Sequence, residues 1–361
     1  MTKRLGILTS GGDCAGLNAA IRAVTLRATE AYNWEVFGIR RGTTGLLQRP
    51  VDTIPLTAKD VGGALIRQGG TFLGSVSRGD PFAYPVGDGR VADLTPEIIE
   101  GIKFLELDAL IGIGGDGSLE IISRLVEIGK FGYVAIPKTI DNDVGFTEQS
   151  IGFATAVDVA TEALDRLQPT AASHDRIMIL EVMGRDAGHI ALHTGIAGGA
   201  DVILIPEIPY RLENIAEKIR KIFASGRDYA LVIVSESVAT ETGEKVVITD
   251  ESGKSRYGGI SHYLADKLSA LTGAETRYTV LGHVQRGAAP SAQDRLLASA
   301  LGVHAVDLVA QGKFNRMVAW RNNAVTDAPI HEVVKNYQAV DVNGSVVHTA
   351  RGLGISLGDA L

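Results

Sequence analysis

The chain has 361 residues, which is too long for one small core, and its 45% hydrophobic and 21% charged residues are typical of a folded globular protein. The formal net charge of −7 argues against nucleic acid or an acidic membrane as a partner, so any bound phosphate needs a local group of basic side chains. With one cysteine, no intrachain disulfide can form, and with neither a signal peptide nor a membrane span recognisable, we expect a cytoplasmic protein.

Short apolar runs alternate with helical patterns along the chain, which is typical of parallel sheets covered by helices. In chain order we expect strands at 5–9, 109–113, 133–136, 177–182, 202–205, 231–234 and 278–281. We expect helices from about 17, over 119–128 and 153–167, and a final one over 291–311. The fold class is therefore α/β, with two doubly wound, mostly parallel-sheet domains between which the chain crosses more than once.

In such sheets ligands bind beyond the carboxyl ends of the strands, so the residues after each strand are the candidates for a site. The first strand is followed by Ser10-Gly11-Gly12-Asp13, where backbone N–H groups can face a phosphate, although a plain tight turn fits as well. The second is followed by Gly114-Gly115-Asp116-Gly117-Ser118. An acidic residue between glycines suits Mg²⁺ bound to phosphate oxygens, and the alternative is a turn with an aspartate N-cap.

A dinucleotide fingerprint overlaps this second segment, because Gly112, Gly114 and Gly117 have its G-x-G-x-x-G spacing. That fingerprint needs an acidic residue at the end of the next strand. This chain has Pro137-Lys138-Thr139 there, which argues against a dehydrogenase.

Polar side chains are dense after the third strand, in the segment from Lys138 through Thr139 and Asp141 to Asp143. One carboxylate could take a proton from a sugar hydroxyl while the other assists a metal, and a helix-capping loop is the alternative. Three later strand ends add Met183-Gly184-Arg185, Ser235-Glu236-Ser237 and the segment 282–287 with His283 and Arg286. Arginines there suit phosphate, although surface arginines are usually only solvated.

Six short segments in this order resemble the 6-phosphofructokinase family: residues 8–13, 70–75, 114–118, 139–143, 181–185 and 279–287. The likeness spans about residues 4 to 300. It implies a glycolytic transferase, a kinase that moves a phosphoryl group from ATP, with Mg²⁺, onto the 1-hydroxyl of fructose 6-phosphate to give fructose 1,6-bisphosphate. The alternatives are a pyrophosphate-dependent enzyme and a non-catalytic effector-binding protein on the same fold. An NAD or lipid kinase would explain residues 114–117 but not the other segments.

The resemblance also implies roles for single residues. Asp141 is the expected catalytic base, and Asp143 supports the metal side. The substrate-binding residues would be Thr139, Asp141, Arg176, Met183, Gly184, Arg185, Glu236, Arg277, His283 and Arg286. The nucleotide would be bound by Gly12, Arg78, Gly115, Asp116, Gly117 and Ser118, with Asp116 as the metal ligand.

The same resemblance implies the organisation of the molecule. Residues 1–152 with about 285–335 would form a nucleotide-binding domain, residues 153–284 with about 336–361 a sugar-phosphate-binding domain, and the active site would lie in the cleft between them. Arg176 and Arg277 resemble arginines that a neighbouring subunit contributes, which implies a homotetramer with shared active sites.

Two features bear on the donor and on regulation. Gly117 resembles ATP-dependent members and Lys138 resembles pyrophosphate-dependent ones, a combination found in the mixed-substrate group. We expect ATP as the phosphoryl donor, because an open position 117 is a prerequisite for a nucleotide.

Where effector pockets for ADP or phosphoenolpyruvate are basic in the family that this chain resembles, this chain has Leu26, Gln68, Gln168 and Ser225, while Arg22 and Arg227 remain. The effector pocket is therefore expected to be depleted of basic side chains.

Overall fold

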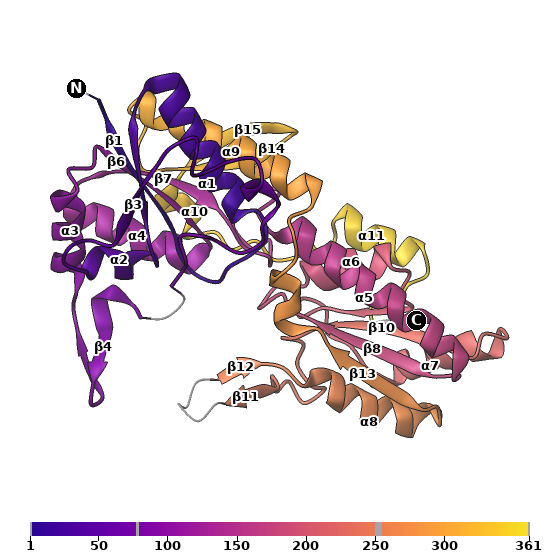
Figure 1. The fold of residues 1–361 in the computed structure, drawn as a ribbon. Helices are drawn as coiled ribbons and strands as arrows, with labels where there is room; N and C mark the ends of the chain where they lie inside the picture. Colours follow the sequence, from indigo (N-terminus) through magenta and orange to yellow (C-terminus); the bar gives the residue numbers. More distant parts are fainter. Residues whose placement is uncertain (1, 77–78, 250–254, 360–361) are drawn as a thin grey trace. The chain divides into compact units, whose positions relative to one another are not determined.

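The computed structural model describes residues 2–76, 79–249 and 255–359, and it divides into two compact units (Figure 1). Unit 1 consists of Met1–Thr155 and Arg286–Tyr337, and unit 2 consists of Ala156–Gln285 and Gln338–Leu361. The chain therefore passes from one unit to the other after Thr155, Gln285 and Tyr337.

Unit 1 is built on a seven-stranded sheet with the order β15-β14-β7-β6-β1-β2-β3. Its strands are β1 (Arg4–Thr9), β2 (Glu35–Ile39), β3 (Thr53–Leu56), β6 (Ala109–Gly114), β7 (Gly132–Pro137), β14 (Arg316–Arg321) and β15 (Ala324–Pro329). The inner pairs are parallel, and the edge strands β3 and β15 are antiparallel to their neighbours. All six residues of β6 are buried, which explains why this strand reads as an unbroken apolar run.

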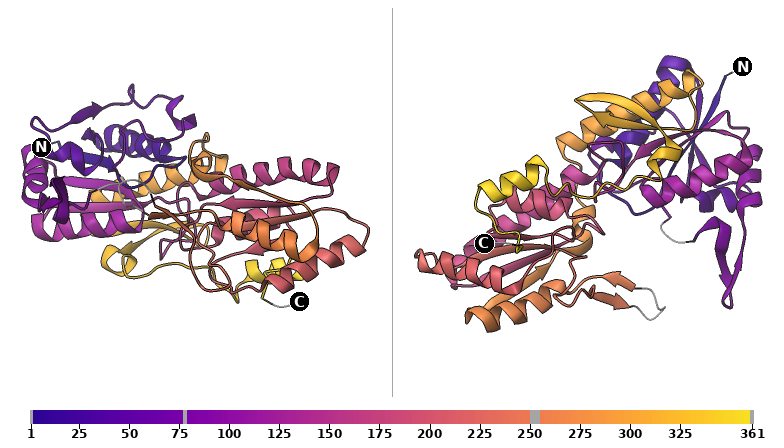
Figure 2. Two further views of the ribbon diagram at one scale, coloured as in Figure 1. Left: turned by 90° about the horizontal axis from the view of Figure 1, so that it is seen from below. Right: turned by 180° about the vertical axis from the view of Figure 1, so that it is seen from behind.

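Helices complete unit 1 around this sheet. They are α1 (Leu17–Leu26), extended by a π-helical turn at Arg27–Ala31, α2 (Thr43–Leu47), α3 (Thr95–Phe104), α4 (Asp116–Gly129), α9 (Ala292–Ala310) and α10 (Ile330–Val333). Helix α1 packs against α9, and α3 lies beside α4 (Figures 1 and 2). A hairpin of β4 (Tyr84–Gly87) and β5 (Arg90–Ala92) projects from the unit (Figure 1).

Unit 2 has a smaller sheet, with the order β13-β8-β10-β9 and only parallel pairs. Its strands are β8 (Ile177–Val182), β9 (Val202–Leu204), β10 (Ala230–Ser235) and β13 (Thr276–Val280). Its helices are α5 (Phe153–Ser173), α6 (His189–Ala197), α7 (Leu212–Ala224), α8 (Ile260–Thr272) and α11 (Ser345–Gly352). A second hairpin, β11 (Val247–Thr249) with β12 (Ser255–Tyr257), extends from this unit (Figure 1).

The fold confirms the α/β class with mostly parallel sheets and corrects two of the expected helices. Helix α5 continues past residue 167 and Pro169 to Ser173, because the buried Ala171 ties its last turn to the core. The helix expected to be final, over 291–311, is α9, and the short helices α10 and α11 follow it.

Candidate active site

The carboxyl ends of β1, β6 and β7 lie side by side, because these strands are parallel neighbours in the sheet of unit 1. Hydrogen bonds continue the register beyond the strands, from Ser10 N to Ile113 O (2.9 Å) and from Lys138 N to Gly114 O (2.9 Å). The three segments that follow these strands, far apart in the sequence, therefore gather at one edge of the sheet.

Helix α4 begins in the second of these segments and faces this edge with its N-terminus. Its N-cap is Gly115, with no side-chain cap, and Asp116 already lies within the first turn. The aspartate N-cap considered above is therefore wrong, and the backbone N–H groups of the first turn are suited to bind phosphate. A Cβ on Gly117 would meet no heavy atom within 4 Å, so packing does not require glycine there.

Two basic side chains converge on the glycine turn after β1. The side chain of Lys138 is buried and donates a hydrogen bond from Nζ to the carbonyl oxygen of Gly12. A Cβ on Gly12 would collide with the guanidinium of Arg286, so glycine permits this close approach. Burial lowers the pKa of Lys138, and the neighbouring Arg286 lowers it further. Lys138 and Arg286 therefore form a local basic pair at the glycine turn after β1.

The loop after β7 holds two buried carboxylates. Asp141 is 8% exposed and Asp143 is 1% exposed. The Asp141 amide donates to Thr139 Oγ1 (3.1 Å), and that hydroxyl donates to Asp141 Oδ2 (3.3 Å). Between them Asn142, with a left-handed backbone (φ 55°), accepts from Ser150 N at 2.9 Å. The next helix starts only at Phe153, so the loop is not a helix cap.

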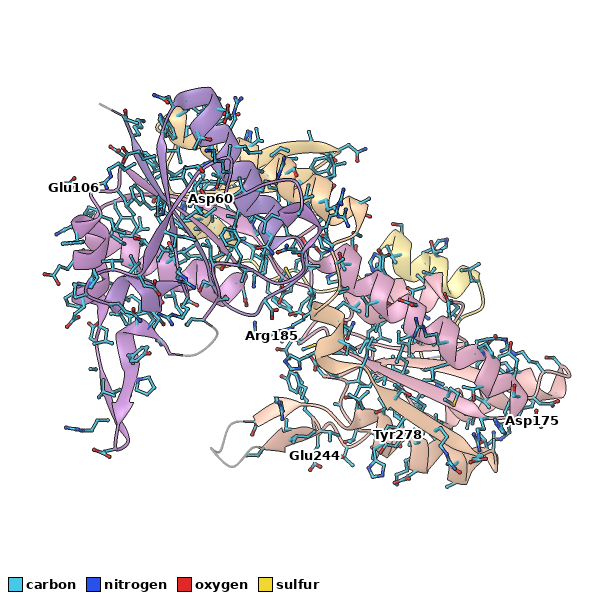
Figure 3. The ribbon with its side chains drawn as sticks, in the orientation of Figure 1. Asp60, Glu106, Asp175, Arg185, Glu244 and Tyr278 are labelled. Carbon is cyan, nitrogen blue, oxygen red and sulfur yellow. The ribbon has the colours of Figure 1, made fainter. Side chains whose placement is uncertain are left out.

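In unit 2, the segments after β8 and β10 meet in the same way, because these strands are also parallel neighbours. The backbone N–H of Arg185 donates to Glu236 Oε1 (3.1 Å), and that of Met183 donates to Gln285 Oε1 (2.8 Å). Figure 3 labels Arg185 beyond the end of β8. His283 is exposed in the 3₁₀ turn Gly282–Arg286.

Arg176 and Arg277 lie elsewhere, at the amino ends of β8 and β13. Both are paired with one carboxylate: Arg176 Nε is 3.0 Å from Glu275 Oε2, and Arg277 pairs with Oε1. The hydrogen bond from Arg176 is the main cause that lowers the pKa of Glu275. The structure therefore does not gather these arginines with Met183, Arg185 or Glu236.

The residues expected to bind the nucleotide are compatible with a magnesium ion that binds together with the phosphate groups of a substrate. Within the described ranges, no three histidine, cysteine or acidic side chains form a metal-binding group. Mg²⁺ commonly uses only one or two carboxylates plus phosphate oxygens and water, and the half-buried Asp116 at the start of α4 can supply one. Arg78 lies outside the described residues.

At the expected effector-pocket positions of unit 2, the remaining Arg227 and the neutral Gln168 both have partners. Arg227 pairs with Asp201, and Gln168 Nε2 donates to Tyr229 Oη at 2.9 Å. In unit 2 neither side chain is therefore positioned as an uncommitted phosphate ligand.

Some residues that support these segments could not be recognised from the sequence. The buried Asp294 accepts hydrogen bonds from Gly152 N (2.9 Å) and Thr155 N (2.8 Å), which fixes the chain that follows the Asp141 loop. Ser291 caps α9 by accepting from Asp294 N, so the S-x-x-D pattern could have indicated the helix start but not this second role. Glu275 and Gln285 gave no recognisable pattern.

No helix in the described part of the chain has the length and apolarity that crossing a bilayer requires.

Comparison with known proteins gives consistent matches. The family model described as "Phosphofructokinase" matches residues 4–309. The chain is 58% identical over 357 residues to "ATP-dependent 6-phosphofructokinase 1" of Synechocystis sp. and 57% identical over 358 residues to the protein of the same name from Nostoc sp., with 99% of both chains covered each time.

Among solved structures, the T-state phosphofructokinase of Pichia pastoris is similar with a TM-score of 0.81 at 30% identity. The match covers 98% of this chain and only 37% of that longer chain. A pyrophosphate-dependent phosphofructokinase from Nitrosospira multiformis has a TM-score of 0.81 at 21% identity, covering 99% and 93% of the chains, and shows the shared fold alone.

Proposed function

The chain belongs to the phosphofructokinase family, and we propose that it is an ATP-dependent 6-phosphofructokinase, a phosphotransferase acting on the 1-hydroxyl of D-fructose 6-phosphate. The observation that carries this proposal is the edge of the unit 1 sheet, where a glycine-led helix N-terminus, a basic pair and the buried Asp141 come together. Unit 1 would bind the nucleotide and unit 2 the sugar phosphate, and the cytoplasm is the expected location.

Phosphoryl transfer requires positioning and charge neutralisation more than covalent chemistry from the protein. The first-turn N–H groups of α4, with Gly12, Gly115 and Ser118, would hold the phosphates of ATP. The open space at Gly117 would leave room for the α-phosphate. When bound at Asp116, Mg²⁺ would neutralise charge on the phosphate oxygens.

Asp141 would accept the proton from the sugar 1-hydroxyl, because a carboxylate held in a rigid loop can serve as a positioned base. The hydrogen bond that its carboxylate accepts from Thr139 Oγ1 would help to hold the side chain in place. Met183, Gly184, Arg185 and Glu236 would bind the sugar.

His283 and Arg286 would bind the 6-phosphate. Arg176 and Arg277 would reach the site of a neighbouring subunit in a homotetramer. This proposal is supported by their position at the amino ends of β8 and β13, because the other residues proposed to bind the sugar follow the carboxyl ends of the strands. Glu275 would keep the two guanidinium groups together.

A coupled assay of fructose 1,6-bisphosphate formation tests the proposal, with Mg-ATP and Mg-pyrophosphate as alternative donors. We expect turnover with ATP, and we expect Asp141→Ser to lower kcat by about 10²–10⁴, with fructose 6-phosphate still bound. Preference for pyrophosphate would contradict the donor assignment, and a variant that keeps more than about a tenth of kcat would contradict the assignment of the base.

A further inference from the structure

The turn that carries Arg185 is anchored at its far side by a three-residue cluster that no step above uses. Lys245 Nζ donates to Asp186 Oδ1 (2.6 Å), and Tyr257 Oη donates to the same oxygen (2.8 Å). Lys245 Nζ also lies 3.1 Å from Tyr257 Oη, which closes the triangle. Lys245 precedes β11 and Tyr257 ends β12, so both come from the projecting hairpin.

The end of strand β8, which leads into the same turn, is hydrogen-bonded to residues that follow the hairpin. Glu181, at the end of β8, is 1% exposed. Its carboxylate accepts from Gly259 N (3.0 Å) and from both the amide (2.9 Å) and the hydroxyl of Ser261, where α8 begins. The described residues between Lys245 and Ser261 therefore contact the chain on both sides of Arg185, at Glu181 before the turn and at Asp186 after it.

The turn itself has a backbone that needs such support. Gly184 has φ 153°, and a Cβ there would lie 2.6 Å from Ala187 O. Arg185 has a left-handed backbone (φ 52°), which is unfavourable for a residue with a side chain. Such a conformation persists where the surroundings fix it, and Asp186 is the next residue along.

We propose that Asp186, Lys245 and Tyr257 are positioning residues that hold Arg185 in the geometry for binding the sugar phosphate. This inference rests on the proposed function of the Met183–Arg185 segment. The cluster acts through Arg185 and does not touch the reacting atoms. Because the side chains of Lys245 and Asp186 are 42% and 44% exposed, their ion pair contributes little to global stability. Its loss should therefore appear in sugar binding before it appears in the melting temperature.

The experiment compares Asp186→Asn, Lys245→Met and Tyr257→Phe with wild type, using Lys267→Met as the matched control. Lys267 is an exposed lysine on α8 of the same unit, lying 5.7 Å from the ring of Tyr263. We expect KM for fructose 6-phosphate to rise about tenfold in Asp186→Asn and Lys245→Met, and less in Tyr257→Phe. KM for ATP and the melting temperature should stay at wild-type values, Lys245→Arg should restore most of the sugar affinity, and the control should change nothing.

A second readout does not depend on activity. Amide hydrogen exchange in a peptide covering residues 183–187 should accelerate in Asp186→Asn and Lys245→Met and stay unchanged in the control. Unchanged exchange would overturn the inference, even if wild type shows no turnover and the proposed function itself fails. A lower melting temperature with unchanged KM would also overturn it, by showing a purely structural role. So would a raised KM in Lys245→Met alone, because Lys245 would then contact substrate directly.

Discussion

Replacing Gly117 by aspartate should selectively remove ATP as a donor. The added Cβ meets no atom of the protein within 4 Å, and an acidic residue in the first turn of α4 interacts favourably with the helix dipole, so the fold should tolerate the change. The carboxylate would occupy the space proposed for the α-phosphate. Two like charges about 4 Å apart repel by about 1–4 kcal/mol at effective dielectric constants of roughly 80 to 20. This corresponds to a loss of roughly fivefold to several hundredfold in kcat/KM for ATP.

The assay is kcat/KM for ATP and for pyrophosphate in wild type, Gly117→Asp and Gly117→Asn. Asparagine has nearly the size of aspartate without its charge, so it separates steric overlap from repulsion. Pyrophosphate lacks the α-phosphate and should be spared, and the buried Lys138 is already beside the glycine turn to meet it. An aspartate variant that uses ATP normally would show that the nucleotide does not pass over position 117 and would refute the reasoning.

Three further outcomes follow from the same geometry. If Arg277 acts across a subunit boundary, reassembling inactive Asp141→Ser with inactive Arg277→Ser should restore part of the activity, and verified mixed oligomers without any recovery would contradict this. ADP and phosphoenolpyruvate should have weak effects on rate, because the neutral Leu26, Gln68 and Gln168 stand where a phosphate pocket needs cations. Each missing charge-assisted hydrogen bond costs roughly 1.5–3 kcal/mol, and micromolar responses to both ligands would contradict this prediction. Burial lowers the pKa of His189 in the folded protein below the value of 6.5 expected in the unfolded chain. The stability that depends on its neutral imidazole is therefore present above pH 6.5 and is lost as the pH falls below it. Between pH about 7.5 and about 5.5, the melting temperature of His189→Gln should therefore fall less than that of wild type. Equal falls in the two proteins would show that His189 does not cause the loss of stability.

The buried parallel strands could be predicted from the sequence because both of their faces are covered. Strand β8 was expected with the bounds Ile177–Val182 that the structure has, and β6 differs by one residue. The edge strands β3 and β15 of unit 1 and both hairpins were missed, since half-exposed strands such as β3 have no continuous apolar run. A strand such as β14 also depends on pairing with β7, far away in the sequence.

The candidate site could be predicted only where chemistry is local in the sequence. Thr139 and Asp141 are two residues apart, so their hydrogen bonds follow from a short motif. The approach of Arg286 to Gly12 depends on tertiary structure, and neither segment indicates the other. The same holds for Asp186 and Tyr257, which lie 71 positions apart.

The three crossings of the chain between the units have a consequence for folding during synthesis. Strand β7 ends at Pro137, but its outer partner β14 starts only at Arg316. At about 5–20 residues per second, a ribosome needs roughly 10–40 s to make the intervening chain. Throughout that interval the growing chain carries one unpaired edge of the larger sheet, because the stretch 156–285 of unit 2 is made before β14 can cover that edge. Such an edge readily pairs with other chains, so aggregation of the nascent protein should be most sensitive to substitutions on β7.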